Sequence, residues 1–198
     1  MASLPKPRFT PQEYLALERQ AEYRSESFNG EISARAPASR EHNLIAGNAA
    51  RQLHSQLKGR PCETYQNDMR VRVSETGLYT YPDVVVVCGE PVFEDAEVDT
   101  LLNPTLIVEV LSTTTEAYDR GDKFEQYRTL ASLQEYVLIA QDRYRVERFV
   151  RQADGQWLFS AANRLDQVVS LASIDCLLPL AEVYDRLELP KPPAAAAS

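Results

Sequence analysis

Two acidic residues stand in or beside apolar runs, where a carboxylate is unusual. Asp83 precedes the run 84–87, and Glu109 interrupts the run 106–111. A buried carboxylate is costly unless a cation or hydrogen-bond donors compensate it. If the two runs are neighbouring strands, Asp83 and Glu109 could hold one metal ion between them, and Lys123 could reach the same point from a following helix. Two carboxylates that bind a metal ion and one lysine beside it are the minimal set of groups for metal-assisted hydrolysis.

The composition indicates which metal such a site would take. The chain has two histidines, and its three cysteines lie far apart, so neither residue type shows the ligand spacing of a zinc site. Carboxylate and carbonyl oxygens suit harder ions. We therefore expect Mg²⁺ or Mn²⁺. The cysteines, Cys62, Cys88 and Cys176, are interpreted as buried apolar residues without disulfide spacing, in a reducing compartment.

Strands must position the two carboxylates. Residues 84–87 and 106–111 have the length and β-branched content of strands buried on both faces of a sheet. Residues 62–65 and 69–73 predict two earlier strands of that same sheet. The acidic segment 90–99, which separates the two central strands, is interpreted as a surface loop.

Helices should cover this sheet. Thr10-Pro11-Gln12-Glu13 is a capping box that opens a helix of about three turns. Ser39 is a candidate N-cap for a long helix that stops at Gly59. A third helix, with Lys123 and Tyr127, follows the polar run 112–115.

The remaining elements are predicted from turn residues and alternation. Asn29-Gly30 predicts a hairpin of the runs 25–28 and 31–34, with Glu26 at its start. A strand at 135–140, a hairpin of 145–151 with 156–161, and a short helix at 180–187 complete the expected elements. We expect residues 1–190 to form one domain and the Pro- and Ala-rich residues 191–198 to be a disordered tail.

The charge and the termini limit the functional classes. A net charge of -8 argues against a broad grip on nucleic acid, although it leaves room for a local basic groove. The first ten residues lack the apolar core of a signal peptide, and no run has the length of a membrane span. We therefore expect a cytoplasmic protein that does not bind membranes.

Six segments in this order resemble one known family. The chain is similar to the PD-(D/E)XK nuclease superfamily and, within it, to the bacterial Uma-two family of endonucleases. The segments are SESFNGEI (25–32), ASREHN (38–43), YPDVVVVCG (81–89), NPTLIVEVLS (103–112), DRGDKFEQY (119–127) and LQEYVLI (133–139). The resemblance implies a restriction endonuclease-like α/β core, with a mixed central sheet flanked by helices. It also implies a divalent-metal-dependent endonuclease that hydrolyses phosphodiester bonds in DNA.

The resemblance assigns roles to individual positions. Asp83 matches the aspartate of the motif, Glu109 matches its second acidic residue, and the carbonyl of Val110 would be a third metal contact. Leu111 stands where the simplest pattern has its lysine; the family resemblance places that lysine on the next helix, at Lys123. Its role would be to orient or deprotonate the attacking water. Glu26 resembles the additional acidic residue that many members supply from an earlier element.

Each candidate residue also has a structural interpretation. Asp83 could be a polar residue at a strand start, and Glu109 a paired structural carboxylate. Lys123 follows Asp119 by four residues, which is the spacing of a solvated helix ion pair. Tyr127 could orient Lys123 or simply pack with its hydroxyl at the surface. His42 could be a base or a residue that packs near a helix start.

A basic run has the same ambiguity. Its four arginines alternate with other residues, so they are either the solvent face of an edge strand or a phosphate-binding row. They are Arg143, Arg145, Arg148 and Arg151.

Other functions remain open at this stage. The nuclease fold could be retained as a catalytically silent module that binds nucleic acid or protein, and the acidic balance favours this alternative somewhat. The two carboxylates could also be the acid and nucleophile of a glycosidase, although a single tryptophan, Trp157, makes a sugar-stacking cleft less favoured. Cutting both strands of a duplex would be easiest for a symmetric pair of sites, so we expect a homodimer.

Overall fold

The computed structural model describes residues 7–190, and a six-stranded sheet lies at its centre. The strands are β3 (Cys62–Gln66), β6 (Val84–Cys88), β8 (Leu106–Leu111), β9 (Glu135–Ala140), β10 (Val146–Arg151) and β11 (Trp157–Ala162). Their order is β11-β10-β9-β8-β6-β3. Strands β8 and β9 are parallel and the other neighbours are antiparallel, so the sheet is mixed, as predicted.

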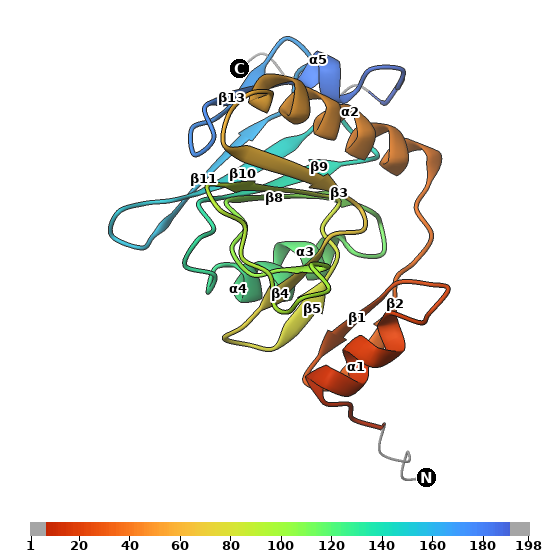
Figure 1. The fold of residues 1–198 in the computed structure, drawn as a ribbon. Coiled ribbons are helices and arrows are strands. Elements are labelled where there is room, and N and C mark those ends of the chain that lie inside the picture. Colours follow the sequence, from red (N-terminus) through yellow and green to blue (C-terminus); the bar gives the residue numbers. More distant parts are fainter. Residues whose placement is uncertain (1–6, 191–198) are drawn as a thin grey trace.

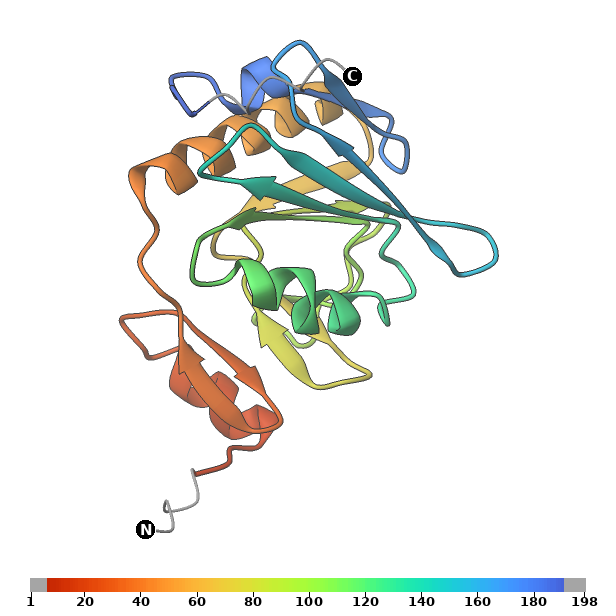
Figure 2. The same ribbon diagram turned by 180° about the vertical axis from the view of Figure 1, so that it is seen from behind.

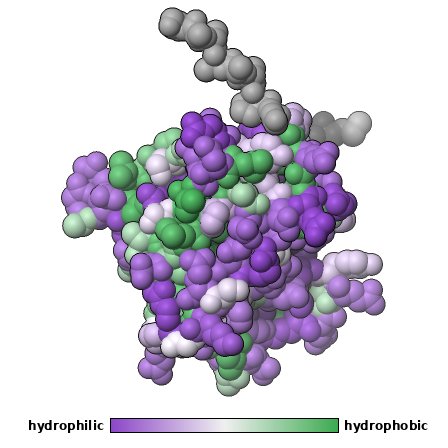
Figure 3. Space-filling view, turned by 90° about the horizontal axis from the view of Figure 1, so that it is seen from above, coloured by the Kyte–Doolittle hydropathy of each residue, from purple (hydrophilic) through white to green (hydrophobic). Residues whose placement is uncertain are grey.

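The central strands are buried on both faces because their residues alternate between two hydrophobic clusters. Val84 and Val108 pack under α2 (Arg40–Leu57), while Val85 and Ile107 pack on the opposite side. The α2 side also holds β12 (Val168–Leu171), β13 (Cys176–Pro179) and α5 (Leu180–Val183). Figures 1 and 2 show α2 along one face of the sheet and the short helices below the other. Seen from the α2 side, the surface is mainly polar, with hydrophobic patches between (Figure 3).

A second sheet lies on the other side and corrects one prediction. It contains β1 (Ser25–Phe28), β2 (Glu31–Ala34), β4 (Arg70–Val73), β5 (Leu78–Thr80) and β7 (Thr100–Leu101), in the order β2-β1-β5-β4-β7. We expected residues 69–73 in the central sheet, which is wrong. The chain turns at Asn67, whose φ is +61°, and β4 then buries Val71 and Val73 beneath the central sheet.

The helix caps confirm the predictions at the first two helices. The helix α1 (Pro11–Glu18) begins with the complete Thr10–Glu13 capping box, and the Ser39 side chain accepts the N–H of His42 at the start of α2. The predicted third helix is instead two short ones, α3 (Glu116–Arg120) and α4 (Asp122–Tyr127). They are separated at Gly121, where φ is -104° and ψ is -98°.

The cysteine prediction is wrong for two of the three residues. Cys62 and Cys88 form a disulfide, because antiparallel pairing of β3 with β6 places them directly opposite each other. They are 26 residues apart in the sequence, so only the strand register brings them together. Cys176 is buried and free, as expected.

The segment 90–99 is more than a surface loop. Its residues Asp95 and Asp99 both bind Arg19, and Asp99 also binds the buried Arg70. Near the C-terminus, α5 is shorter than predicted, and the hairpin of β12 and β13 was not predicted. The predicted disordered tail lies outside the described residues. Among the residues that are described, no helix has the length and apolar character that a membrane span requires.

Candidate active site

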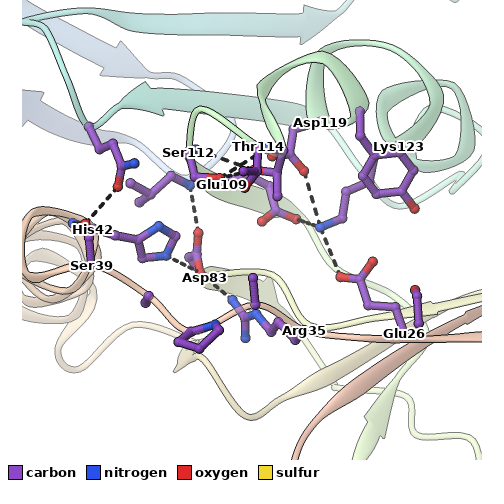
Figure 4. A pocket seen from close by; sticks show the side chains of 18 of the residues that line it. Glu26, Arg35, Ser39, His42, Asp83, Glu109, Ser112, Thr114, Asp119 and Lys123 are labelled. Atoms are coloured by element: carbon purple, nitrogen blue, oxygen red, sulfur yellow. Dashed lines mark hydrogen bonds and ion pairs between the residues drawn. The ribbon is translucent and has the colours of Figure 1, made fainter.

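The two carboxylates singled out in the sequence lie together. Asp83 directly precedes β6, Glu109 lies within β8, and the pairing of Val84 with Val108 makes these strands neighbours. Both acids are nearly inaccessible, with 1 % and 3 % of their surface exposed. Figure 4 shows them in the middle of a pocket, with Lys123 on one side and His42 on the other. The condition on which the metal prediction depended, adjacent strands, is therefore met.

Asp83 receives three hydrogen bonds. The backbone N–H of Val110 donates to Oδ2 at 2.8 Å, while Arg35 and His42 contact Oδ1 at 2.5 Å and 3.0 Å. Burial alone would raise the pKa of Asp83, but the contacts with His42, Arg35 and the Val110 N–H outweigh it and hold that pKa below its usual value. Asp83 is therefore an ionised carboxylate, although it is buried.

The pKa of Glu109 is shifted in the opposite direction to that of Asp83. Its Oε1 lies 2.9 Å from Lys123 Nζ and accepts a hydrogen bond from the Tyr127 hydroxyl at 2.8 Å. Burial, with Asp119 and Asp83 nearby, outweighs the attraction of Lys123 and raises the pKa of Glu109 to about 8. In the metal-free pocket, Lys123 alone therefore does not compensate the burial of the Glu109 side chain.

Lys123 is surrounded by acids. Besides Glu109, its Nζ lies 3.3 Å from Glu26 and 3.5 Å from Asp119, and the side chain is 5 % exposed. Burial opposes its charge, but the three carboxylates raise the pKa of Lys123 above its ordinary value. The i,i+4 ion pair with Asp119 does form, but it is buried rather than solvated. The helix is broken at Gly121, so α4 begins at Asp122 and Lys123 stands in its first turn, next to the pocket.

The three remaining predicted residues also reach the site. Glu26, on β1, accepts a hydrogen bond from Thr80 at 2.6 Å as well as contacting Lys123. His42 and Tyr127 each contact one of the two central carboxylates, so Tyr127 holds Glu109 rather than orienting Lys123 alone. Because the N–H and C=O of a strand residue face the same side, the carbonyl of Val110 also faces the side of Asp83.

Two charged residues of the pocket were missed from the sequence. Asp119 was considered only as the ion-pair partner of Lys123, yet its side chain lines the pocket. Arg35 gave no signal, because it follows a strand in a segment without helical or strand periodicity. Only its contact with Asp83 identifies it.

The arginine row does not form a free phosphate-binding surface. Arg143 contacts Glu116, Arg145 contacts Glu147, and Arg151 donates to backbone carbonyls of residues 128, 130 and 133. Arg148 donates to the carbonyl of Ser170. These side chains are occupied within the protein, which favours the structural interpretation.

The pocket has an excess of negative charge. Its volume is about 430 Å³, and it is bounded by β1, the connection 35–39, the start of α2, the end of β8 and the helices α3 and α4. Its acidic residues are Glu26, Asp83, Glu109 and Asp119, and its permanently cationic residues are Arg35 and Lys123. If all four acids were ionised, two negative charges would be unmatched, and they would repel a phosphodiester unless a cation joined them.

The donor atoms suit a small, hard cation. Within residues 7–190, no three or more His, Cys, Asp and Glu side chains are grouped so that they could hold a metal ion. Mg²⁺, however, is usually bound by one or two carboxylates and keeps several waters, so Asp83, Glu109 and the Val110 carbonyl are a sufficient set of oxygens. Burial is the main cause of the raised pKa of Glu109, with Asp119 and Asp83 adding to it, and a bound cation would favour the charged form of this group. The residues therefore fit Mg²⁺ or Mn²⁺ better than zinc.

Comparison with known proteins gives relatives of the same size. Two uncharacterized proteins of Synechocystis sp. are 44 % identical over 151 residues (76 % of this chain and 85 % of theirs) and 35 % identical over 167 residues (83 % and 87 %). The crystal structure of a "putative nuclease belonging to DUF820" from Anabaena variabilis matches with a TM-score of 0.73 at 19 % identity. That match covers 88 % of this chain and 97 % of the other, and it supports the fold.

A family model covers most of the chain. It matches residues 11–179, a range that includes every residue of the pocket, and it is described as "Putative restriction endonuclease". The mixed sheet and the structural neighbour agree with a restriction endonuclease-like fold. The chain belongs to this family, Uma2.

Proposed function

We propose that this protein is a divalent-metal-dependent endonuclease that hydrolyses phosphodiester bonds in DNA. The observation that carries the proposal is the pair of buried acids, Asp83 directly before β6 and Glu109 on the adjacent β8, at a pocket with more acids than bases. Arg35 and Lys123 contact this pair, but the acids of the pocket still outnumber its bases, which favours an additional cation. Membership of a restriction endonuclease-like family supports the same class of reaction.

The metal would be held by three oxygen donors. Asp83 and Glu109 would supply carboxylate oxygens, and Val110 its backbone carbonyl. When bound, Mg²⁺ or Mn²⁺ would add positive charge beside the phosphate and lower the pKa of a bound water. The chain itself holds Asp83 ionised through Val110 and His42, and it fixes the Glu109 carboxylate through the Tyr127 hydroxyl.

Lys123 would act as a charged hydrogen-bond donor. In the metal-free pocket the surrounding acids raise the pKa of Lys123, which favours the protonated ammonium group and a donor role over that of a base. It would orient the attacking water and place positive charge beside the phosphate as charge develops there. Glu26 and Asp119 would keep the ammonium group at the pocket by contacting it from two further sides.

The first experiment measures metal binding and cleavage on the same samples. Mg²⁺ and Mn²⁺ would be titrated calorimetrically into the wild type and into Asp83→Asn and Glu109→Gln, and supercoiled plasmid and single-stranded DNA would be offered as substrates. Glu75→Gln, an exposed acid in the turn before β5, is the matched control. The proposal requires metal binding and cleavage in the wild type and the control, and the loss of both in the site variants.

The other results would lead to different conclusions. Metal binding that depends on both carboxylates, without cleavage of either DNA, would favour a silent module that binds nucleic acid or protein. If neither ion binds and the variants behave as the wild type, the two carboxylates are structural.

We also propose that the active form is a homodimer, because two symmetric sites can cut both strands of a duplex. Sedimentation would show a dimer in the presence of DNA. A species that remains monomeric at working concentration, with and without DNA, would contradict this part of the proposal.

A further inference from the structure

Arg35 reaches from the edge of the pocket onto a buried acid. It directly follows β2 and begins the connection 35–39 that leads to α2. One guanidinium nitrogen donates to Asp83 Oδ1 at 2.5 Å, and another donates to the carbonyl of Asn67 at 3.2 Å. The Arg35 side chain is 27 % exposed, whereas that of Asp83 is 2 % exposed. Neither strand pattern nor helix periodicity requires an arginine here.

The three donors to Asp83 differ in their freedom to move. The N–H of Val110 is part of the β8 backbone, and His42 stands in the first turn of α2, where Ser39 caps its N–H. Arg35 is a long side chain on a partly exposed connection. A cation that takes Asp83 Oδ1 must displace a donor from that oxygen and also repels a neighbouring guanidinium. Of the three donors, Arg35 is therefore the one that can leave most easily.

A displaced Arg35 has a second use within the same pocket. The other permanent cation, Lys123, is 5 % exposed and is held by three carboxylates. Arg35 is more exposed, and its planar group presents several N–H donors in the geometry that matches phosphate oxygens. Of the two cations that line the pocket, it is the one that can turn toward a ligand at the opening.

We propose that Arg35 stands in for the metal ion at Asp83 and, once an ion is bound, contacts a backbone phosphate of the nucleic acid. This inference rests on the proposed function. It links two events: the ion frees the arginine, and the arginine then strengthens substrate binding. By thermodynamic reciprocity, DNA should also increase the affinity for the ion.

The test compares Arg35→Gln with Arg40→Gln. Arg40 lies five residues further on, is 67 % exposed at the start of α2 and contacts only its neighbour Glu41 among the ion pairs of the described residues, so it is a matched control. Calorimetry gives the affinity for Mn²⁺. Binding of a hydrolysis-resistant phosphorothioate duplex in Mn²⁺ is then measured at several salt concentrations.

Two opposite changes are expected in Arg35→Gln. The affinity for Mn²⁺ should rise by about threefold at least, because the Arg35 guanidinium no longer competes for Asp83. The duplex should bind more weakly, and the dependence of log K on log[salt] should become shallower by about one, as expected for one lost phosphate contact. Arg40→Gln should change neither quantity.

A conservative variant distinguishes a specific role of Arg35 from an effect of misfolding. Arg35→Lys keeps the charge and should retain the wild-type affinity for Mn²⁺ while binding DNA less well, because it lacks the planar fork. The thermal midpoint of each variant, with and without Mn²⁺, reports whether it is folded. Unchanged metal affinity or an unchanged salt slope in folded Arg35→Gln would overturn the inference. If the wild type binds neither Mn²⁺ nor DNA, the proposed function itself fails.

Discussion

Two clusters of charged side chains in this protein differ in their ratio of acidic to basic residues. The balanced cluster pairs two arginines with two aspartates: Arg19, Arg70, Asp95 and Asp99. The pocket cluster sets four acids against two bases: Glu26, Asp83, Glu109, Asp119, Arg35 and Lys123. In the balanced cluster the pKa of each aspartate is lowered, whereas in the pocket cluster the pKa values of Glu109 and Asp119 are raised and only that of Asp83 is lowered, among the shifts that are resolved.

The difference separates a structural role from a functional one. Opposite charges in equal number balance each other and join the segment 90–99 to β4 and to Arg19 at the end of α1. An excess of acid in a cavity leaves charge that a ligand from outside can satisfy. Perturbed titration at a cleft is a marker of function for this reason. We therefore expect substitutions in the two clusters to have opposite consequences.

The largest effect should come from Glu109→Gln. The amide can still accept the hydrogen bond from Tyr127, but it cannot ionise when a metal ion binds. We expect plasmid cleavage to fall by about 10²–10³-fold or more, the scale for loss of a major electrostatic group. In the absence of metal, the free energy of unfolding in urea should stay the same or rise. A clear loss of stability without metal would indicate that the pocket cluster is structural.

The second largest effect should be the loss of stability on metal removal, which should depend on the pocket cluster and not on the balanced cluster. At a free Mg²⁺ concentration 100 times its Kd, the free energy of unfolding should exceed that in a chelator by about 2.7 kcal/mol. Asp83→Asn should abolish this difference, while Asp95→Asn should preserve it. The measurement is thermal or urea unfolding with and without Mg²⁺. Equal stabilisation of the wild type and Asp83→Asn would place the ion elsewhere.

Asp99→Asn should weaken the fold and leave the site intact. It leaves Arg70, whose side chain is 3 % exposed, without its carboxylate. Because Asp99 itself is partly solvated, we expect a loss of about 1–3 kcal/mol rather than the larger cost of a fully buried pair. Affinity for Mn²⁺, measured calorimetrically, should not change.

The pH dependence of this loss has a definite sign. Hydrogen bonds from Arg19 are the main cause that lowers the pKa of Asp99. A carboxyl group whose pKa is lowered by folding stabilises the protein at any pH above its pKa in the unfolded chain, about 3.9. This stabilisation is lost as the pH falls toward the lower pKa of the folded state. The gap between wild type and Asp99→Asn should therefore be full at pH 7 and shrink below about pH 4. A gap that widens in acid would contradict the charge pairing.

The smallest effect should come from Tyr127→Phe. It removes one hydrogen bond to Glu109 and keeps the aromatic packing against Tyr136. Groups that hold a metal ligand in place contribute about tenfold or somewhat more, so we expect cleavage to fall by about tenfold. A weaker affinity for Mn²⁺ should accompany this loss. Tyr144→Phe, which loses a hydroxyl outside the pocket, is the control and should retain cleavage.

The sequence was sufficient to predict the parts of the fold that depend on local signals. The capping box of α1, the Ser39 cap and the buried strands β6 and β8 follow from residue types over short windows. The strands carry two of the acids, so the centre of the candidate site was predicted with them. The family resemblance then supplied the lysine position on the next helix.

The remaining features depend on contacts between distant residues. The transfer of β4 to a second sheet results from the turn at Asn67, and the Cys62–Cys88 disulfide results from strand register. Arg35 meets Asp83 across 48 positions of the sequence, and no local pattern indicates that contact. The excess of acid could be counted only after the pocket was assembled.

The connection 35–39 divides the chain into two pieces of unequal size. Before it, α1 and the β1–β2 hairpin form a lobe (Figure 1). The lobe meets the rest through the pairing of β1 with β5, the packing of Tyr14 on Tyr79, and ion pairs of Arg19 and Glu26. The exposed residues 36–38 are a site where a chain break should be tolerated. The short fragment would carry Glu26 and the long one the central carboxylates. Recovery of cleavage on mixing would then make this protein a split reporter for the association of two fused partners.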